Sequence, residues 1–122
     1  MPKVIHFDIV ADDPERAMKF YESALGWKFD KWEGPMEYWL ITAGPEDETG
    51  IGGGLARRSD PSQGTENTIG VPSLDEAVKK VEESGGKVTR PKSAIPGVGW
   101  MASCLDTEGN SFTIMQEDPN AK

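Results

Sequence analysis

Hydrophobic and polar residues alternate at the start of the chain, over residues 3–10. Ile5, Phe7 and Ile9 fall on one side of the strand that this alternation predicts, and His6 and Asp8 fall on the other. His6 is the only histidine of the chain. The pattern therefore predicts a half-buried strand that carries the histidine and a carboxylate on one face.

Helical spacing replaces the alternation in "ADDPERAMKFYESALGW". Asp12 or Asp13 is expected to cap the helix, Pro14 fits its first turn, and Gly26 predicts its end. A second helix is predicted in "SLDEAVKKVEESGG", from a cap at Ser73 to the double glycine.

The remaining periodic segments predict short strands separated by polar or glycine-rich loops. "SDPSQGT" is the best candidate for a linker, "PKSAIPGVG" is expected to be a loop, and "EDPNAK" a fraying tail. The predicted strands are Trp27–Trp32, Met36–Thr42, the segment "IGGGLARR", Glu66–Val71, Lys87–Arg90, Trp100–Leu105 and Ser111–Gln116.

The order strand–helix–strand–strand–strand occurs twice, and the two halves align at an offset of 60 residues. At this offset His6 aligns with Glu66, and Gly53 aligns with Thr113. We therefore predict an α+β fold in a single domain, residues 1–122. It would consist of two βαβββ modules, about 1–57 and 65–118, whose mixed sheets curve to form a cleft lined by these four positions.

Composition limits the classes of partner. The 122 residues carry 13 basic and 21 acidic side chains, a net charge of −8, which argues against nucleic acid and is compatible with a cationic ligand or simply with solubility. No apolar run reaches the roughly 20 residues that span a bilayer, and no signal-peptide pattern opens the chain, so we expect a cytoplasmic protein without a membrane partner. The single cysteine, Cys104, is expected to be buried and inert.

The chain resembles the vicinal oxygen chelate superfamily, which includes glyoxalases, bleomycin-resistance proteins and extradiol dioxygenases. The residues that carry the resemblance are "HFDIVADDPERAMKFYESALGW", "VPSLDEAVKKVEESGGKV" and "GWMASCLDTEGNSFTIMQ". The resemblance covers nearly the whole chain and is strongest to small glyoxalase-like proteins. It implies paired βαβββ modules and a homodimer. In enzymatic members it also implies a divalent metal held by His and Glu side chains at the four positions of the repeat.

These four positions contain only two good ligands in this chain, His6 and Glu66, while Gly53 and Thr113 stand where the family supplies glutamates. A metal such as Zn, Ni, Mn or Mg would depend on this pair, with Glu66 as ligand or as catalytic base. The glycine run at 52–54 is expected to leave room for a ligand. The predicted cleft residues are His6, Asp8, Trp39, Gly53, Glu66, Trp100 and Thr113.

Two functions follow from the resemblance. The first is a protein that binds a small molecule in the cleft without a complete metal site, as in the bleomycin-resistance branch. The alternative is a metal-dependent lyase or isomerase of the glyoxalase I type. A dioxygenase is disfavoured, because its iron site needs two histidines and this chain has one.

Overall fold

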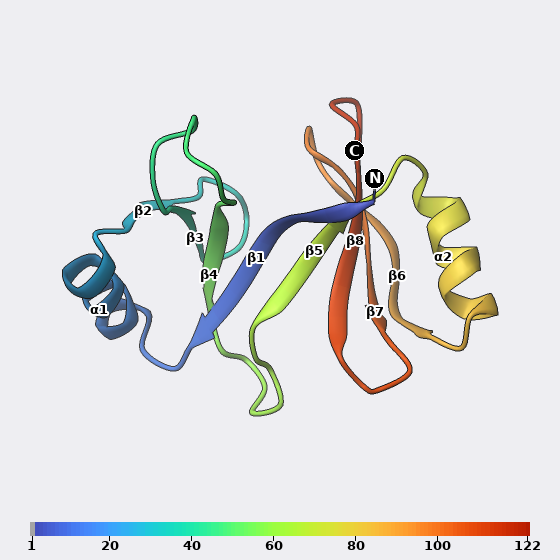
Figure 1. Ribbon diagram of the computed structural model, residues 1–122, viewed down its shortest axis with the longest axis horizontal. Helices are drawn as coiled ribbons and strands as arrows, with labels where there is room; N and C mark the ends of the chain where they lie inside the picture. The colour runs from blue at the N-terminus through green and yellow to red at the C-terminus, as the bar shows by residue number, and fades with distance from the viewer. Residues whose placement is uncertain (1) are drawn as a thin grey trace. The chain divides into compact units, whose positions relative to one another are not determined.

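A computed structural model describes residues 2–122. Its internal contacts group residues 6–65 into one compact unit, the first unit, and residues 2–5 and 66–122 into another, the second unit. The order of elements is βαβββ twice over (Figure 1). The predicted α+β class and the two βαβββ modules are therefore confirmed.

The first unit contains one helix and a mixed sheet. β1 and β4 pair in parallel, while β3 pairs antiparallel with both β4 and β2. The order across this sheet is β2-β3-β4-β1. Its elements are β1 (Lys3–Ala11), whose residues from His6 onward belong to this unit, α1 (Pro14–Leu25), β2 (Lys28–Lys31), β3 (Tyr38–Thr42) and β4 (Gly53–Arg57).

The second unit repeats this arrangement. β5 and β8 pair in parallel, and β7 pairs antiparallel with both β8 and β6, which gives the order β5-β8-β7-β6. Its elements are β5 (Glu66–Gly70), α2 (Leu74–Glu83), β6 (Lys87–Ile95), β7 (Gly99–Leu105) and β8 (Ser111–Glu117).

Both helices begin and end where the sequence indicates. The Asp13 carboxylate accepts a hydrogen bond from the Arg16 backbone N–H at 3.1 Å, and the Ser73 hydroxyl caps α2 in the same way. Gly26 ends α1 with φ 72°, in the left-handed region that glycine adopts at least cost. No helix within residues 2–122 is both long and apolar enough to cross a bilayer.

Aromatic side chains connect α1 to its sheet. Tyr21 of α1 stacks on Trp27 with ring centroids 4.8 Å apart, and Trp27 contacts Phe7 of β1 at 5.9 Å. Leu55 of β4 is fully buried in this unit. Because side chains alternate along a strand, the face that holds Phe7 packs toward α1, and His6 and Asp8 face away from it.

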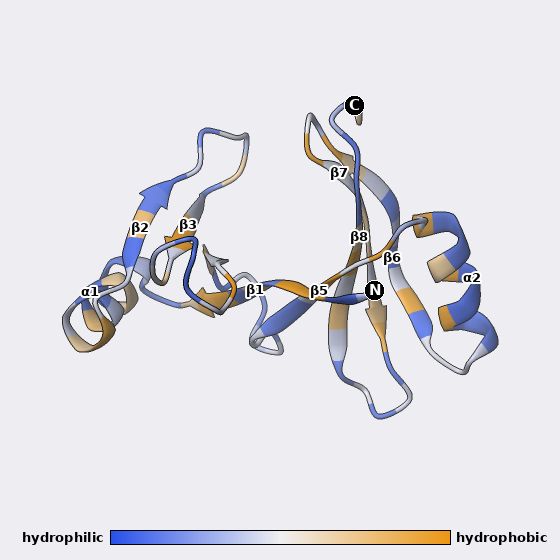
Figure 2. Ribbon diagram, turned by 45° about the horizontal axis from the view of Figure 1, so that its top comes forward, coloured by the Kyte–Doolittle hydropathy of each residue, from blue (hydrophilic) through white to orange (hydrophobic). Residues whose placement is uncertain are grey.

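Aliphatic side chains form the equivalent core of the second unit. Figure 2 shows the hydrophobic segments of α2 on its side nearest the strands and hydrophilic segments on its outer side. The core is a cluster of buried residues between α2 and the sheet: Val71, Leu74, Ala102, Cys104 and Ile114. The prediction of a buried Cys104 is confirmed, and burial raises the pKa of its thiol, which suits an inert residue.

Two predictions about the second unit are wrong. β6 does not end at Arg90 but continues through Pro91 to Ile95, because β6 is an edge strand and register shifts after Val88 and Arg90 accommodate the proline. The polar tail does not fray. The Ala121 carbonyl accepts a hydrogen bond from the Gly97 N–H at 2.9 Å, and Ala121 is 3% exposed.

Candidate functional site

A three-residue polar cluster lies on the face of the first unit that points away from α1. The Tyr38 hydroxyl donates to Asp8 Oδ1 at 2.5 Å. His6 Nε2 lies 2.8 Å from the Tyr38 oxygen and 3.3 Å from the same Asp8 oxygen. We call His6, Asp8 and Tyr38 the polar cluster.

The geometry of the polar cluster determines where its protons lie. Two oxygens 2.5 Å apart need a proton between them, so the Tyr38 hydrogen points to Asp8 and not to His6. His6 Nε2 must then bring its own hydrogen and donate it to the Tyr38 oxygen. The neutral imidazole therefore carries its proton on Nε2, which leaves the lone pair on Nδ1.

Burial and the neighbouring Asp8 carboxylate act together on Tyr38. Burial is the larger cause, and the hydrogen bond and the charge of Asp8 add to it, so the pKa of the Tyr38 phenol lies far above its usual range. The phenol stays protonated at any physiological pH and acts as a permanent donor to Asp8.

Sequence reasoning did not select Tyr38. Neighbours on a strand point to opposite faces, so only one of Tyr38 and Trp39 can share a face with His6, and the predicted cleft residues include Trp39. The structure pairs Trp39 with Leu55, on the face that packs toward α1, where Lys31 Nζ lies 5.8 Å from the Trp39 ring. The sequence offered one signal for Tyr38: its hydroxyl can form a hydrogen bond with the carboxylate of Asp8.

Trp100 also lies on a helix-covered face and does not share a face with Glu66 and Thr113. It packs against the buried core of the second unit. Its indole N–H donates to Asp118 at 3.0 Å, and Lys92 Nζ lies 4.9 Å from its ring. Trp39 and Trp100 therefore contribute to the packing of their own units, and the prediction that both line a cleft is not supported by their faces.

The second unit holds a smaller polar pair on its face away from α2. The Thr113 hydroxyl donates to Glu66 Oε1 at 3.0 Å, and Thr113 itself is buried. Thr68 of β5 is the register partner of Thr113, and it is buried too. The sequence correctly paired Glu66 with Thr113 on one face of this unit, and it missed Thr68.

The register corrects the alignment of the last strands. Thr113 lies opposite Thr68, whereas the residue opposite Asp8 is Gly54 and not Gly53. The offset is thus 60 residues at the first strand of each module and 59 at the last. Gly54 is the equivalent of Thr113, and Gly53 lies on the Phe7 face.

The space beside these glycines belongs to aromatic side chains of the protein. A Cβ at Gly54 would lie 1.6 Å from the Tyr38 hydroxyl oxygen, and a Cβ at Gly53 would meet Phe7, whose ring is 2.8 Å away and whose backbone carbonyl oxygen is nearer still. The glycine run was predicted to leave room for a ligand. Here it lets Tyr38 reach across β4 to Asp8, which no larger residue at position 54 would allow.

The residues present do not fit the divalent metal that the family implies. No three His, Cys, Asp or Glu side chains within residues 2–122 come together as a metal-binding group. His6 Nε2 donates within the polar cluster, so only Nδ1 of His6 could ligate a metal, and the other two positions of the repeat supply a glycine and a threonine in place of carboxylates. We therefore derive no chemical step through a metal at His6 and Glu66.

Arg57, the last residue of β4, and Arg58, which follows it, are paired with carboxylates of the first unit. Arg57 Nε lies 3.0 Å from Glu37 Oε1, and Arg58 Nε lies 3.0 Å from Asp12 Oδ1. Neither guanidinium is left unpaired to attract an anionic ligand.

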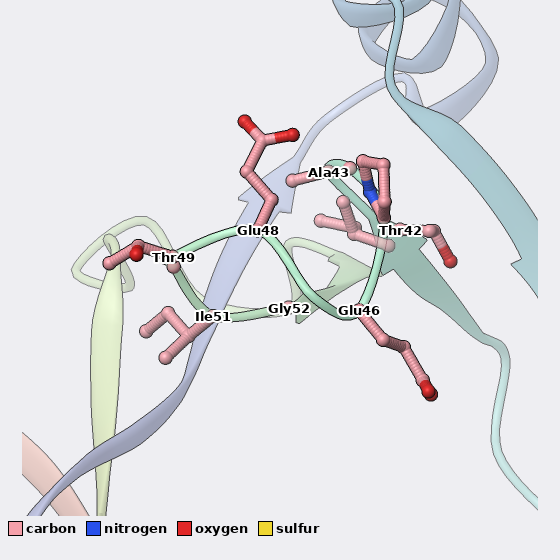
Figure 3. A pocket seen from close by; sticks show the side chains of 11 residues that line it. Thr42, Ala43, Glu46, Glu48, Thr49, Ile51 and Gly52 are labelled. Carbon is pink, nitrogen blue, oxygen red and sulfur yellow. The ribbon is translucent and has the colours of Figure 1, made fainter.

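A separate hollow of about 380 Å³ lies in the loop between β3 and β4. Figure 3 shows the side chains of Glu46 and Glu48 pointing away from one another there, and both residues are exposed. The hollow is lined by residues 41–46 and 48–52 and includes no member of the polar cluster.

The chain belongs to the Glyoxalase/Bleomycin resistance protein/Dioxygenase superfamily, whose model matches residues 3–114. Among curated proteins it is 29% identical over 107 residues to "Probable lactoylglutathione lyase, chloroplastic" of Arabidopsis thaliana, covering 80% of this chain and 31% of that protein. It is 26% identical over 118 residues to "Putative glyoxylase CFP32" of Mycobacterium tuberculosis, covering 92% of this chain and 43% of that protein. The chain thus spans less than half the length of these curated relatives.

Solved structures share the fold at low identity. A methylmalonyl-CoA epimerase from Mycobacterium tuberculosis superposes with a TM-score of 0.70 at 15% identity, over 95% of this chain and 88% of that one. A hypothetical protein from Bacillus halodurans gives 0.71 at 18% identity, over 99% and 98% of the two chains. At this identity the likeness describes the fold and not the activity.

Proposed function

We propose that this protein binds a small molecule at the polar cluster without the help of a metal. The observation that carries the proposal is the hydrogen-bond triangle of His6, Asp8 and Tyr38, in which His6 Nε2 acts as a donor. A histidine held in this way orients its Nδ1 lone pair as an acceptor, and the carboxylate beside it keeps the second oxygen for a ligand.

Exposure supports the same assignment. The side chains of His6 and Asp8 are 29% and 33% exposed, so the cluster is anchored by packing yet open to solvent on one side. Trp32 meets the Tyr38 ring edge-on at 6.0 Å and adds an apolar surface beside the polar atoms. Apolar walls with a few well-placed polar groups are typical of small-molecule sites.

The relatives support a small organic ligand in general terms. An epimerase from Streptomyces coelicolor with the same fold is described in complex with 2-nitronate-propionyl-CoA, and matches at a TM-score of 0.69 and 12% identity. That ligand belongs to that protein. Several expectations from the sequence stay predictions: the cleft between modules, the single domain over residues 1–122 with module bounds at about 1–57 and 65–118, the homodimer and the cytoplasmic location.

Nitrogen-15 NMR tests the proposal directly. A fragment mixture that includes propionyl-CoA would be titrated into the labelled protein in EDTA, and we expect binders to shift the amides of residues 6, 8 and 38. Glu22→Gln removes one negative charge at an exposed position of α1. It serves as the control for Asp8→Asn, which removes one negative charge at the polar cluster. Shifts that appear only after Zn²⁺, Ni²⁺ or Mn²⁺ is added would contradict a metal-independent site.

A metal-dependent lyase of the glyoxalase I type is the second candidate, and the name of the Arabidopsis relative favours it. Under this alternative His6→Ala would abolish both bound metal and activity, with Glu66 as ligand or base. Native mass spectrometry of the purified protein separates the two candidates, because it reports retained metal and retained organic ligand in one spectrum.

A further inference from the structure

We infer that the ligand of the polar cluster is an organic cation that carries N–H donors, such as a primary amine. This inference rests on the proposed function and specifies its ligand class. It follows from a count of the donors and acceptors that the cluster leaves unused, together with the distribution of charge around it.

The hydrogen-bond donors of the polar cluster are all used within the cluster. The Tyr38 hydrogen goes to Asp8 Oδ1, and the His6 Nε2 hydrogen goes to the Tyr38 oxygen. What remains are two acceptors, His6 Nδ1 and Asp8 Oδ2, which no hydrogen bond joins to another group of residues 2–122. A ligand therefore has to supply the donors, and a carbonyl or a carboxylate would meet only acceptors.

The distribution of charge around Asp8 also indicates a cationic ligand. Asp8 is half-buried, and within residues 2–122 its one ionic neighbour is His6, which is neutral unless protonated. Arg57 and Arg58, the cations nearest in sequence to Gly54, are paired with Glu37 and Asp12. The site thus has a formal charge of −1, and the net charge of −8 for the whole chain adds an attractive field for cations.

The second unit shows the same local chemistry. Glu66 is partly buried, accepts one hydrogen bond from Thr113 through Oε1, and forms no ion pair with Lys or Arg in the described part of the chain. Each unit thus presents a carboxylate with one oxygen tied to a hydroxyl of its own sheet and the other oxygen unpaired. Each of these oxygens can accept a hydrogen bond from an N–H donor at its own unit.

The test is a titration with three probes of nearly equal size, benzylamine, benzyl alcohol and benzoate, at constant ionic strength. The aromatic ring matches the Trp32 and Tyr38 surfaces, so only the polar group differs. We expect benzylamine to shift the amides of residues 6, 8 and 38 in a saturable way, benzyl alcohol to bind more weakly, and benzoate to leave them unchanged.

Variants localise the effect. Asp8→Asn is expected to weaken benzylamine binding by at least about tenfold, because it removes a hydrogen bond to a charged acceptor. Glu22→Gln removes the same charge from exposed α1 and is expected to change affinity by less than about twofold, because exposed charges are screened. Glu66→Gln leaves the polar cluster intact. Comparing it with Asp8→Asn distinguishes a contribution of Glu66 to benzylamine binding from a loss of affinity caused by misfolding of the Asp8 variant.

The outcomes separate the ligand class from the site. Benzoate or benzyl alcohol that shifts the cluster as strongly as benzylamine would overturn the cationic class and leave the proposed binding site in place. Benzylamine that shifts no cluster residue, or that binds Asp8→Asn as tightly as the parent protein, would overturn the inference as well. The fragment titration in EDTA independently decides whether the cluster binds any small molecule.

Discussion

The two units build the same carboxylate–hydroxyl pair with side chains of different reach. In the second unit a short threonine hydroxyl suffices, because Thr113 of β8 is adjacent to β5, the strand of Glu66. In the first unit the hydroxyl comes from Tyr38 of β3, two strands away from Asp8, and it crosses β4 over Gly54. The position that supplies the hydroxyl in one unit is thus the glycine that makes room for it in the other.

This difference removes the room for a carboxylate side chain at position 54 without any change of fold. A glutamate at position 54 would have no space while Tyr38 occupies it, and Tyr38 holds His6 Nε2 as a donor. The paired modules therefore carry two related but unequal polar sites.

Filling position 54 is expected to cost most. Gly54→Ala would place a Cβ 1.6 Å from the Tyr38 oxygen, and we expect it to lower the free energy of unfolding by about 3 kcal/mol, as overpacking does. In a Tyr38→Ala background the same change should cost less than about 0.5 kcal/mol, because the obstructing phenol is gone. Urea denaturation of the four proteins of this cycle measures the coupling.

Gly64→Ala is the matched control, since a Cβ there meets nothing within 4 Å and the residue does not have a positive φ. It is expected to be neutral or to stabilise by a few tenths of a kcal/mol. Equal costs for Gly54→Ala in the presence and absence of the Tyr38 ring would show that Tyr38 does not depend on this glycine.

Removing the Tyr38 hydroxyl is expected to have a smaller effect that depends on pH. Tyr38→Phe should destabilise by about 1–2 kcal/mol at neutral pH, because Asp8 loses its donor. The pKa of Tyr38 is raised in the folded protein, so ionisation favours the unfolded chain. Stability from this group is full below pH ~10 and declines above it, by at most about 1.4 kcal/mol per pH unit.

The measurement is the free energy of unfolding from pH 7 to 11 in both proteins. We expect the parent protein to lose stability more steeply than Tyr38→Phe above pH ~10. Parallel curves for the two proteins would mean that the phenol titrates alike in the folded and unfolded states, against the burial seen here.

The second unit should respond least. Thr113→Val removes one hydroxyl that donates to Glu66, keeps the shape of the side chain, and is expected to cost about 0.5–1.5 kcal/mol. Glu66→Gln should change little in the Thr113→Val background, since the two side chains share one hydrogen bond. If Thr113→Val lowered the free energy of unfolding more than Tyr38→Phe does, the order proposed for the two sites would be reversed.

Much of the fold could be predicted from the sequence because its signals are local. Caps at Asp13 and Ser73 and the glycine at position 26 locate the helices, and the alternation around His6 places it with Asp8 on one face. His6 and Glu66 lie on the first strand of their modules. No difference in loop length within the modules therefore displaces their alignment.

The rest of the site depends on distances between strands, which a fixed offset cannot follow. Asp8 and its partner Gly54 are 46 residues apart, whereas Thr68 and Thr113 are 45 apart, so one residue of difference moves the alignment to the wrong face. The choice between Tyr38 and Trp39 failed for a related reason. Both are large aromatics on a short strand, and only the pairing of β3 with β4 decides which of them faces His6.

The state of the His6 imidazole tests the central claim most directly. His6 is the only histidine, so a long-range nitrogen-15 NMR spectrum of the ring contains a single pair of signals. The account predicts a proton on Nε2 and a bare Nδ1, unchanged when Zn²⁺, Ni²⁺ or Mn²⁺ is added in stoichiometric amount. A bare Nε2, or an Nε2 signal that moves when the metal is added, would contradict it.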